Sequence, residues 1–198
     1  MNFTSKPAIL LGSFDPPTIG HIHLISEALK VGVSCVYVIP AFGNPWKTGQ
    51  TEFSHRYKMT KTLESLYQPG KVVVMELERT LAYLNDSTLP PGNPHAYIPT
   101  YYLLRELHKR LPEFQVITTN ETYREIPRWI NGEEILKNNE FLVFSVSHLG
   151  EGISGSIEIL DLPVSSTLVR EALKRGESRP EYLTQDIIRY IKQNKLYT

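Results

Sequence analysis

Short apolar runs recur along the chain, and a stretch with helical spacing of its apolar positions follows most of them. This alternation is typical of a parallel sheet whose strands are joined by crossover helices, so the sequence predicts an α/β fold. The runs read as buried strands are Ala8–Leu11, Cys35–Ile39, Val72–Leu77, Phe114–Thr118 and Phe141–Val146, with Ser156–Leu160 as a further candidate.

Helical spacing is clearest in two segments between the strands. One helix is predicted to begin at His21, with Ile22, Ile25 and Leu29 on a single face. A second carries Leu103, Leu107 and Leu111 on one face, and Pro99 suits its first helical position. A third helical stretch is predicted from His55 to Leu66. These apolar faces indicate packing against a sheet.

The chain is predicted to end in two helices, Ser166–Arg175 and Thr184–Asn194, the first closed by Gly176 in a C-cap position. The segment Asn85–Pro99 is proline-rich and longer than most loops in compact domains. We expect it to act as a lid over a site or as a subunit contact.

The length of 198 residues predicts one domain, residues 1–198. Lys plus Arg and Asp plus Glu number 21 each, so net charge gives no reason to expect nucleic acid or a membrane as a partner. The single cysteine, Cys35, cannot form an internal disulfide, and the first eleven residues do not resemble a signal peptide. We therefore expect a cytoplasmic protein, and a homo-oligomer is compatible with the sequence.

The first strand leads directly into Gly12-Ser13-Phe14-Asp15-Pro16-Pro17-Thr18-Ile19-Gly20-His21 and then into a helix. Backbone N–H groups and the helix dipole favour a phosphate at such a helix N-terminus, at the carboxyl edge of a sheet. Glycine lets the backbone approach a ligand closely, and His21 can donate a hydrogen bond to a bridging phosphate oxygen. We expect Asp15 to order its own loop through an Asx-type turn rather than to contact a substrate.

This segment resembles the Gly-Ser/Thr-Phe-Asp-Pro…Thr/His-x-Gly-His motif of the nucleotidyltransferase superfamily. Further segments are similar to its nicotinate mononucleotide adenylyltransferases: Asn44-Pro45-Trp46-Lys47, Val164-Ser165-Ser166-Thr167-Leu168-Val169-Arg170, and Leu196-Tyr197 at the end. The resemblance extends over nearly the whole chain. It implies a Rossmann-like domain with a parallel sheet, helices on both faces and a C-terminal helical appendage.

Ser165, Ser166 and Thr167 form an N-cap cluster at the start of the first C-terminal helix, where hydroxyls and free N–H groups bind anions, and Arg170 lies one turn later. The two helix beginnings are therefore predicted to face each other across one phosphate cleft. The candidate residues fall in three groups. The catalytic group is His21, Thr18, Lys47 and Arg170; the nucleotide-binding group is Gly12, Ser13, Phe14, Gly20, Ser165, Ser166 and Thr167; the acceptor-binding group is Trp129, Glu121 and Asn44.

The acceptor region departs from the family pattern. Ile126-Pro127-Arg128-Trp129 is similar to the family's Leu-Pro-x-Trp, whose Trp stacks on the pyridine ring. Thr119 and Glu121, however, replace the family's Gly and Asp, while Ala96 and Ser145 replace Ser and Arg. The sequence thus leaves the identity of the acceptor open.

The resemblance implies transfer of the adenylyl group of ATP to nicotinate mononucleotide, with release of pyrophosphate and with Mg²⁺ as cofactor. Nicotinamide mononucleotide and phosphopantetheine are alternative acceptors, and a non-catalytic nucleotide-binding module is the alternative from another class. No protein side chain is assigned as a metal ligand, because Mg²⁺ is commonly held by water and phosphate oxygens.

Overall fold

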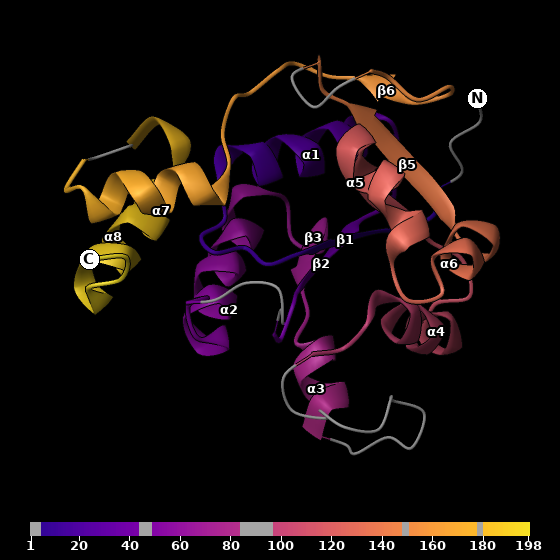
Figure 1. The fold of residues 1–198 in the computed structure, drawn as a ribbon, viewed down its shortest axis with the longest axis horizontal. Coiled ribbons are helices and arrows are strands. Elements are labelled where there is room, and N and C mark those ends of the chain that lie inside the picture. The colour runs from indigo at the N-terminus through magenta and orange to yellow at the C-terminus, as the bar shows by residue number, and fades with distance from the viewer. Residues whose placement is uncertain (1–4, 44–48, 84–96, 148–150, 178–179) are drawn as a thin grey trace.

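The computed structural model of the protein describes residues 5–43, 49–83, 97–147, 151–177 and 180–198. Its strands form one sheet in the order β3-β2-β1-β4-β5-β6, and every neighbouring pair is parallel (Figure 1). The strands are β1 (Ala8–Gly12), β2 (Val36–Pro40), β3 (Val72–Val74), β4 (Gln115–Thr119), β5 (Glu140–Ser145) and β6 (Ile157–Glu158).

The strand order places a topological switch point between β1 and β4. From β1 the chain moves outward to β3, and then crosses back to continue on the other side of β1. In open α/β sheets of this order, ligands bind outside the carboxyl ends of the two strands at the switch point. The loops after Gly12 and Thr119 lie at those ends.

Helices cover both faces of the sheet, as predicted (Figure 1). They are α1 (Ile19–Lys30), α2 (Phe53–Lys61), α3 (Leu77–Tyr83), α4 (Thr100–Arg110), α5 (Asn120–Glu125), α6 (Gly132–Asn138), α7 (Ser166–Lys174) and α8 (Gln185–Asn194), with 3-10 turns η1 (Thr62–Leu66), η2 (Ile126–Arg128) and η4 (Pro180–Tyr182).

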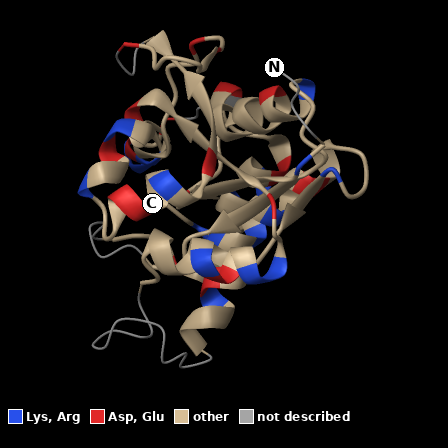
Figure 2. Ribbon diagram, turned by 90° about the vertical axis from the view of Figure 1, so that its right-hand side faces the viewer, with Lys and Arg blue, Asp and Glu red and all other residues tan. Residues whose placement is uncertain are grey.

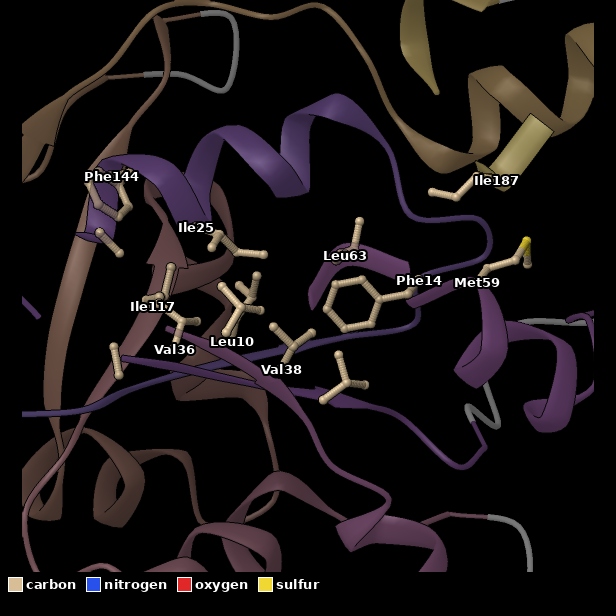
Figure 3. Close-up of a cluster of buried hydrophobic side chains, with 14 of the residues drawn as sticks. Leu10, Phe14, Ile25, Val36, Val38, Met59, Leu63, Ile117, Phe144 and Ile187 are labelled. Carbon is tan, nitrogen blue, oxygen red and sulfur yellow. The ribbon is translucent and has the colours of Figure 1, made fainter. Parts of the chain in front are cut away.

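Successive strand side chains point to opposite faces, and this divides the core in two. Leu10 of β1 belongs to the first core cluster, which is covered by α1, α2, η1, α7 and α8 (Figure 3). Ile9 belongs to the second core cluster, which is covered by α3, α4, η2 and α6. The two C-terminal helices bury Val169, Ile187 and Ile191 in the first core cluster, so the predicted appendage is an integral part of the core.

The stretch predicted as one helix from His55 to Leu66 is α2 from Phe53 followed by the 3-10 turn η1. Three other predicted boundaries were wrong for a local reason. Helix α1 begins at Ile19 rather than His21, because Thr18 is its N-cap. Pro99 is the N-cap of α4, with an extended ψ of 138°, and not its first helical residue. Strand β3 ends at Val74 and not at Leu77. Leu77 is instead the first residue of α3, a helix that the sequence pattern did not predict.

Gly176 follows α7 with a φ of 73°, which confirms its predicted role in ending that helix. The Lys, Arg, Asp and Glu residues are interspersed over the fold rather than separated by sign (Figure 2). Within the described residues, no helix is long and apolar enough to span a membrane.

Candidate functional site

The loop after β1 is shaped by a buried aromatic ring. Phe14 has a φ of 49°, and its side chain is only 1% exposed within the first core cluster. A Cβ atom added at Gly12 would lie 3.1 Å from Cζ of that ring. Phe14 packing therefore favours glycine at position 12, and an approach of a ligand to the Gly12 backbone stays a prediction. Phe14 itself is a core residue, and only its backbone can face a nucleotide.

Thr18 and His21 form a capping arrangement at the first turn of α1. The backbone N–H of Thr18 donates to Nδ1 of His21 at 3.0 Å, and Oγ1 of Thr18 lies 2.9 Å from the same atom. Because Nδ1 accepts a hydrogen bond, the proton of the neutral imidazole ring is on Nε2. His21 therefore presents Nε2–H as a hydrogen-bond donor.

The beginning of α7 lies against the same loop. Ser165 is its N-cap and accepts from the backbone N–H of Leu168 at 3.1 Å. Oγ of Ser166 donates to the carbonyl of Pro16 at 2.8 Å, and Nη1 of Arg170 donates to the carbonyl of Asp15 at 2.7 Å. The predicted juxtaposition of the two helix beginnings is thus present in the structure.

Gly20 allows this close approach. A Cβ atom added there would lie 3.3 Å from Cγ1 of Val164, in the segment that leads into α7. Such a contact is tighter than most carbon contacts in proteins, so a larger residue would push the two segments apart. Thr167 completes the helix beginning, where its Oγ1 accepts from Nη2 of Arg170 at 3.2 Å.

A cavity of about 630 Å³ opens between these helix beginnings and the carboxyl ends of β4 and β5. Its volume lies in the range of small-molecule sites. It brings together seven residues predicted for the site or noted as departures from the family pattern, in a lining that is otherwise mostly apolar. The lining is Thr18, Gly20, His21, His23, Leu24, Thr119, Glu121, Val146, Ile159, Leu160, Leu162, Pro163, Val164, Ser165, Ser166 and Leu168.

The structure does not place every candidate in this cavity. Trp129 follows η2, does not line the cavity and is 37% exposed. It is therefore not a core residue either. Asn44 and Lys47 lie outside the described residues, as do Ala96 and most of the predicted lid at 85–99.

Two departures from the family pattern have structural partners. Oγ1 of Thr119 caps α5 by accepting from the backbone N–H of Thr122, and its φ of −93° needs no glycine. Oγ of Ser145 lies 2.5 Å from Oγ of Ser156, which joins the end of β5 to the segment before β6. Both substitutions therefore stabilise the edge of the sheet beside the cavity.

Sequence reasoning did not find the buried guanidinium of Arg56. Its side chain, 1% exposed, donates to four backbone carbonyls on the loops after β1 and β2: Ser13 at 2.8 Å, Ala41 at 2.7 Å, Phe42 at 2.9 Å and Thr51 at 2.7 Å. Burial lowers the pKa of Arg56 from its ordinary value, while the nearby charges of Asp15 and Glu78 oppose that change. A single arginine at the start of a helix gives no sequence signal for this role.

Two further buried polar groups were missed. Burial raises the pKa of Glu78 to about 8, although the backbone N–H of Phe42 donates to its Oε2 at 2.8 Å. Asn120 is fully buried at the start of α5, where its amide exchanges hydrogen bonds with the backbone of Val146 and donates to the carbonyl of Glu151. Asn120 thereby fixes the ends of β4 and β5 against each other.

Asp15 corrects another expectation. Its carboxylate does not order its own loop. Instead, Oδ2 accepts from the backbone N–H of Thr51 at 3.2 Å, and Oδ1 accepts from the hydroxyl of Tyr197 at 2.7 Å. Asp15 is 3% exposed and so connects three parts of the chain beside the cavity.

Comparison with known proteins matches this architecture. The chain is 26% identical to a probable nicotinate-nucleotide adenylyltransferase of Chlorobaculum tepidum, over 98% of this chain and 99% of that protein. It is 29% identical to the corresponding protein of Leifsonia xyli, over 98% and 95%. Plasmodium falciparum nicotinic acid mononucleotide adenylyltransferase complexed with NaAD superposes with a TM-score of 0.78 at 22% identity, covering 98% of this chain and 97% of that chain.

The profile of the cytidylyltransferase-like family matches residues 9–172, a range that contains β1 from its second residue, both helix beginnings and the cavity between them. The fold, the motif after β1 and the relatives all agree with this match. The chain is an enzyme of the nucleotidyltransferase class and belongs to the cytidylyltransferase-like family.

Proposed function

We propose that the chain transfers the adenylyl group of ATP to nicotinate mononucleotide, releasing pyrophosphate and forming the dinucleotide precursor of NAD. The observation that carries the proposal is the hydrogen-bonded juxtaposition of the α1 and α7 beginnings at the switch point of the sheet. Two adjacent helix N-termini suit a polyphosphate, because their N–H groups and dipoles attract anions. The names carried by relatives that match nearly the full length support the acceptor.

In the proposed reaction, a phosphate oxygen of the acceptor attacks the α-phosphorus of ATP. A new P–O bond forms, the bond between the α-phosphorus and its bridging oxygen breaks, and pyrophosphate leaves with that electron pair. No covalent enzyme intermediate is needed, so the protein contributes positioning and charge stabilisation.

His21 is proposed to donate its Nε2–H to the phosphates as negative charge develops, because Nδ1 is already used by Thr18. The N–H groups at the start of α1, including Gly20, face the same anion. On the opposite side, Ser165, Ser166 and Thr167 supply the second helix beginning, and Arg170 supplies positive charge. The apolar part of the cavity suits the nucleoside.

Glu121 lines the cavity on the β4 side and is proposed to contact the acceptor. Lys47, Asn44 and Trp129 remain proposed contacts to the triphosphate and the acceptor. Because Trp129 is exposed in this structure, a ring platform at that position requires the acceptor itself to cover it.

Mg²⁺ is proposed to enter together with ATP. Among the described residues, no three His, Cys, Asp or Glu side chains converge, and both carboxylate oxygens of Asp15 already accept hydrogen bonds. These residues fit a cation held by phosphate oxygens and water, as Mg²⁺ prefers. Bound there, it would neutralise charge on the leaving pyrophosphate.

Pyrophosphate release from ATP, measured with nicotinate mononucleotide, nicotinamide mononucleotide and phosphopantetheine in turn, tests the proposal. We expect the highest kcat/KM with nicotinate mononucleotide. A higher value with either of the others would reassign the acceptor. Binding of ATP without pyrophosphate from any acceptor would instead favour a non-catalytic nucleotide-binding module.

A further inference from the structure

The carboxyl terminus of the chain returns to the loop between β1 and α1. Helix α8 ends at Asn194, and the chain reverses at Lys195, where φ is 49° and the N–H of Leu196 donates back to the carbonyl of Ile191 at 3.1 Å. This turn directs Tyr197 inward. Its hydroxyl donates to Oδ1 of Asp15 at 2.7 Å, across a separation of 182 residues.

The backbone of Tyr197 is strained in a way that favours a specific role. Its φ of 62° lies in the left-handed region, which a bulky aromatic residue rarely adopts. Such a conformation persists only where the surrounding contacts over-determine it, and it is common at functional sites. Burial raises the pKa of the Tyr197 hydroxyl, so the hydroxyl remains a protonated donor at neutral pH.

Asp15, the acceptor of this hydrogen bond, orients side chains of the proposed phosphate cleft. Its main-chain carbonyl accepts from Nη1 of Arg170, and the carbonyl of the next residue, Pro16, accepts from Oγ of Ser166. A shift of Asp15 would therefore move both α7 side chains relative to α1. Figure 1 shows α7 and α8 at the end of the molecule where α1 begins.

We propose that Tyr197 is a positioning residue of the nucleotidyltransferase site, fixing through Asp15 the loop that holds the α1 and α7 beginnings together. The inference rests on the proposed function for its catalytic readout. Tyr197 itself does not line the cavity, so it acts through Asp15 and not by contact with a substrate.

Tyr197→Phe removes the hydroxyl and keeps the ring, and Tyr190→Phe is the matched control. Tyr190 also lies near the C-terminus, and its hydroxyl is 2.9 Å from Nδ1 of His55 on α2, away from Asp15. We expect Tyr197→Phe to lower kcat about tenfold, since a small misplacement of binding groups has effects of this order or larger. The kcat of Tyr190→Phe should stay within about twofold of that of the wild type, and its melting temperature should be similar to the wild-type value.

Hydrogen exchange of the backbone amides in residues 12–22 gives a readout that needs no catalysis. We expect those amides to exchange faster in Tyr197→Phe than in Tyr190→Phe, while amides of β4 exchange equally in both. Equal exchange in the two variants, or equal kcat, would overturn the proposed positioning role. If the wild type releases no pyrophosphate with any acceptor, the proposed function fails, and hydrogen exchange still decides whether Tyr197 fixes the loop.

A combined variant separates positioning from general destabilisation. Alanine at position 15 removes the oxygen that accepts from the Tyr197 hydroxyl. If Tyr197 acts only through Asp15, Tyr197→Phe should lower kcat much less in an Asp15→Ala background than in the wild type. Equal fold-losses in the two backgrounds would show that Tyr197 acts by another route and would contradict the proposal.

Discussion

Replacing His21 separates two roles of this side chain at the first turn of α1. One ring nitrogen caps the helix, and the other is the proposed donor to the substrate. Nδ1 of His21 accepts from the backbone N–H of Thr18 at 3.0 Å, while Nε2–H is the proposed donor to phosphate. Asparagine places an oxygen near the position of Nδ1 and has nothing at the position of Nε2. His21→Asn therefore keeps the cap and removes the donor, whereas His21→Ala removes both.

Loss of the Nε2–H donor affects turnover, and loss of the helix cap affects the free energy of unfolding. Removing one preorganised donor to a transition state lowers turnover about 100-fold, which corresponds to about 2.7 kcal/mol. Losing a helix cap lowers the free energy of unfolding by about 1 kcal/mol. Both variants also lose the contact between the rings of His21 and Phe14, whose centroids lie 4.9 Å apart. The stability lost with this contact is therefore the same in both and does not affect their difference.

We expect kcat for pyrophosphate release to fall about 100-fold in both variants. In urea denaturation, His21→Ala should be less stable than His21→Asn by about 1 kcal/mol. An Asn variant that keeps wild-type turnover would refute the role of Nε2–H in catalysis. Equal stability of the two variants would refute the capping role of Nδ1.

Three further predictions concern the buried polar groups around the site. Arg56→Lys should lower the free energy of unfolding by about 2 kcal/mol, because a lysine ammonium cannot donate hydrogen bonds to all four carbonyls. The control is Arg189→Lys at an exposed position, and an equal loss of unfolding free energy in both variants would contradict this reasoning. Because the folded-state pKa of Glu78 is about 8, above its ordinary value of 4.5, the folded state binds that proton more tightly, and stability is lost as pH rises between these values. From pH 5.5 to 7.5 the wild type should lose about 2 kcal/mol relative to Glu78→Gln in urea denaturation, and parallel pH profiles would disprove the shift. Asn120→Asp should lower stability at pH 7 by about 2 kcal/mol, because a carboxylate cannot donate to the carbonyls of Val146 and Glu151, and an unchanged urea midpoint would count against this.

Much of the fold could be predicted because its sequence signals are local. Buried parallel strands appear as apolar runs, and each of the six expected strands is present within a few residues of its predicted bounds. Helix α3 was missed because Leu77 continues the apolar run of β3, so no polar residue marked where the strand ended. Boundaries such as that of α1 depend on which residue caps the helix.

The candidate site was predictable in part for the same reason. A short motif identified the Thr18 and His21 region, and the Ser165 region was identified by its capping residues. The roles of Asp15 and Tyr197 were not predictable, because they depend on a contact between residues 182 positions apart. The sequence also does not reveal that the Phe14 ring packs against Gly12.

The claim that the α1 and α7 beginnings together hold a triphosphate is tested most directly by a crystal structure with a non-cleavable ATP analogue, in which a methylene group replaces the α,β-bridging oxygen. We predict the phosphates within hydrogen-bond distance of Nε2 of His21 and of backbone N–H groups at the beginnings of both helices, with the nucleoside in the cavity beside Val164. An analogue bound at another edge of the sheet, or with its phosphates away from both helix beginnings, would contradict the account.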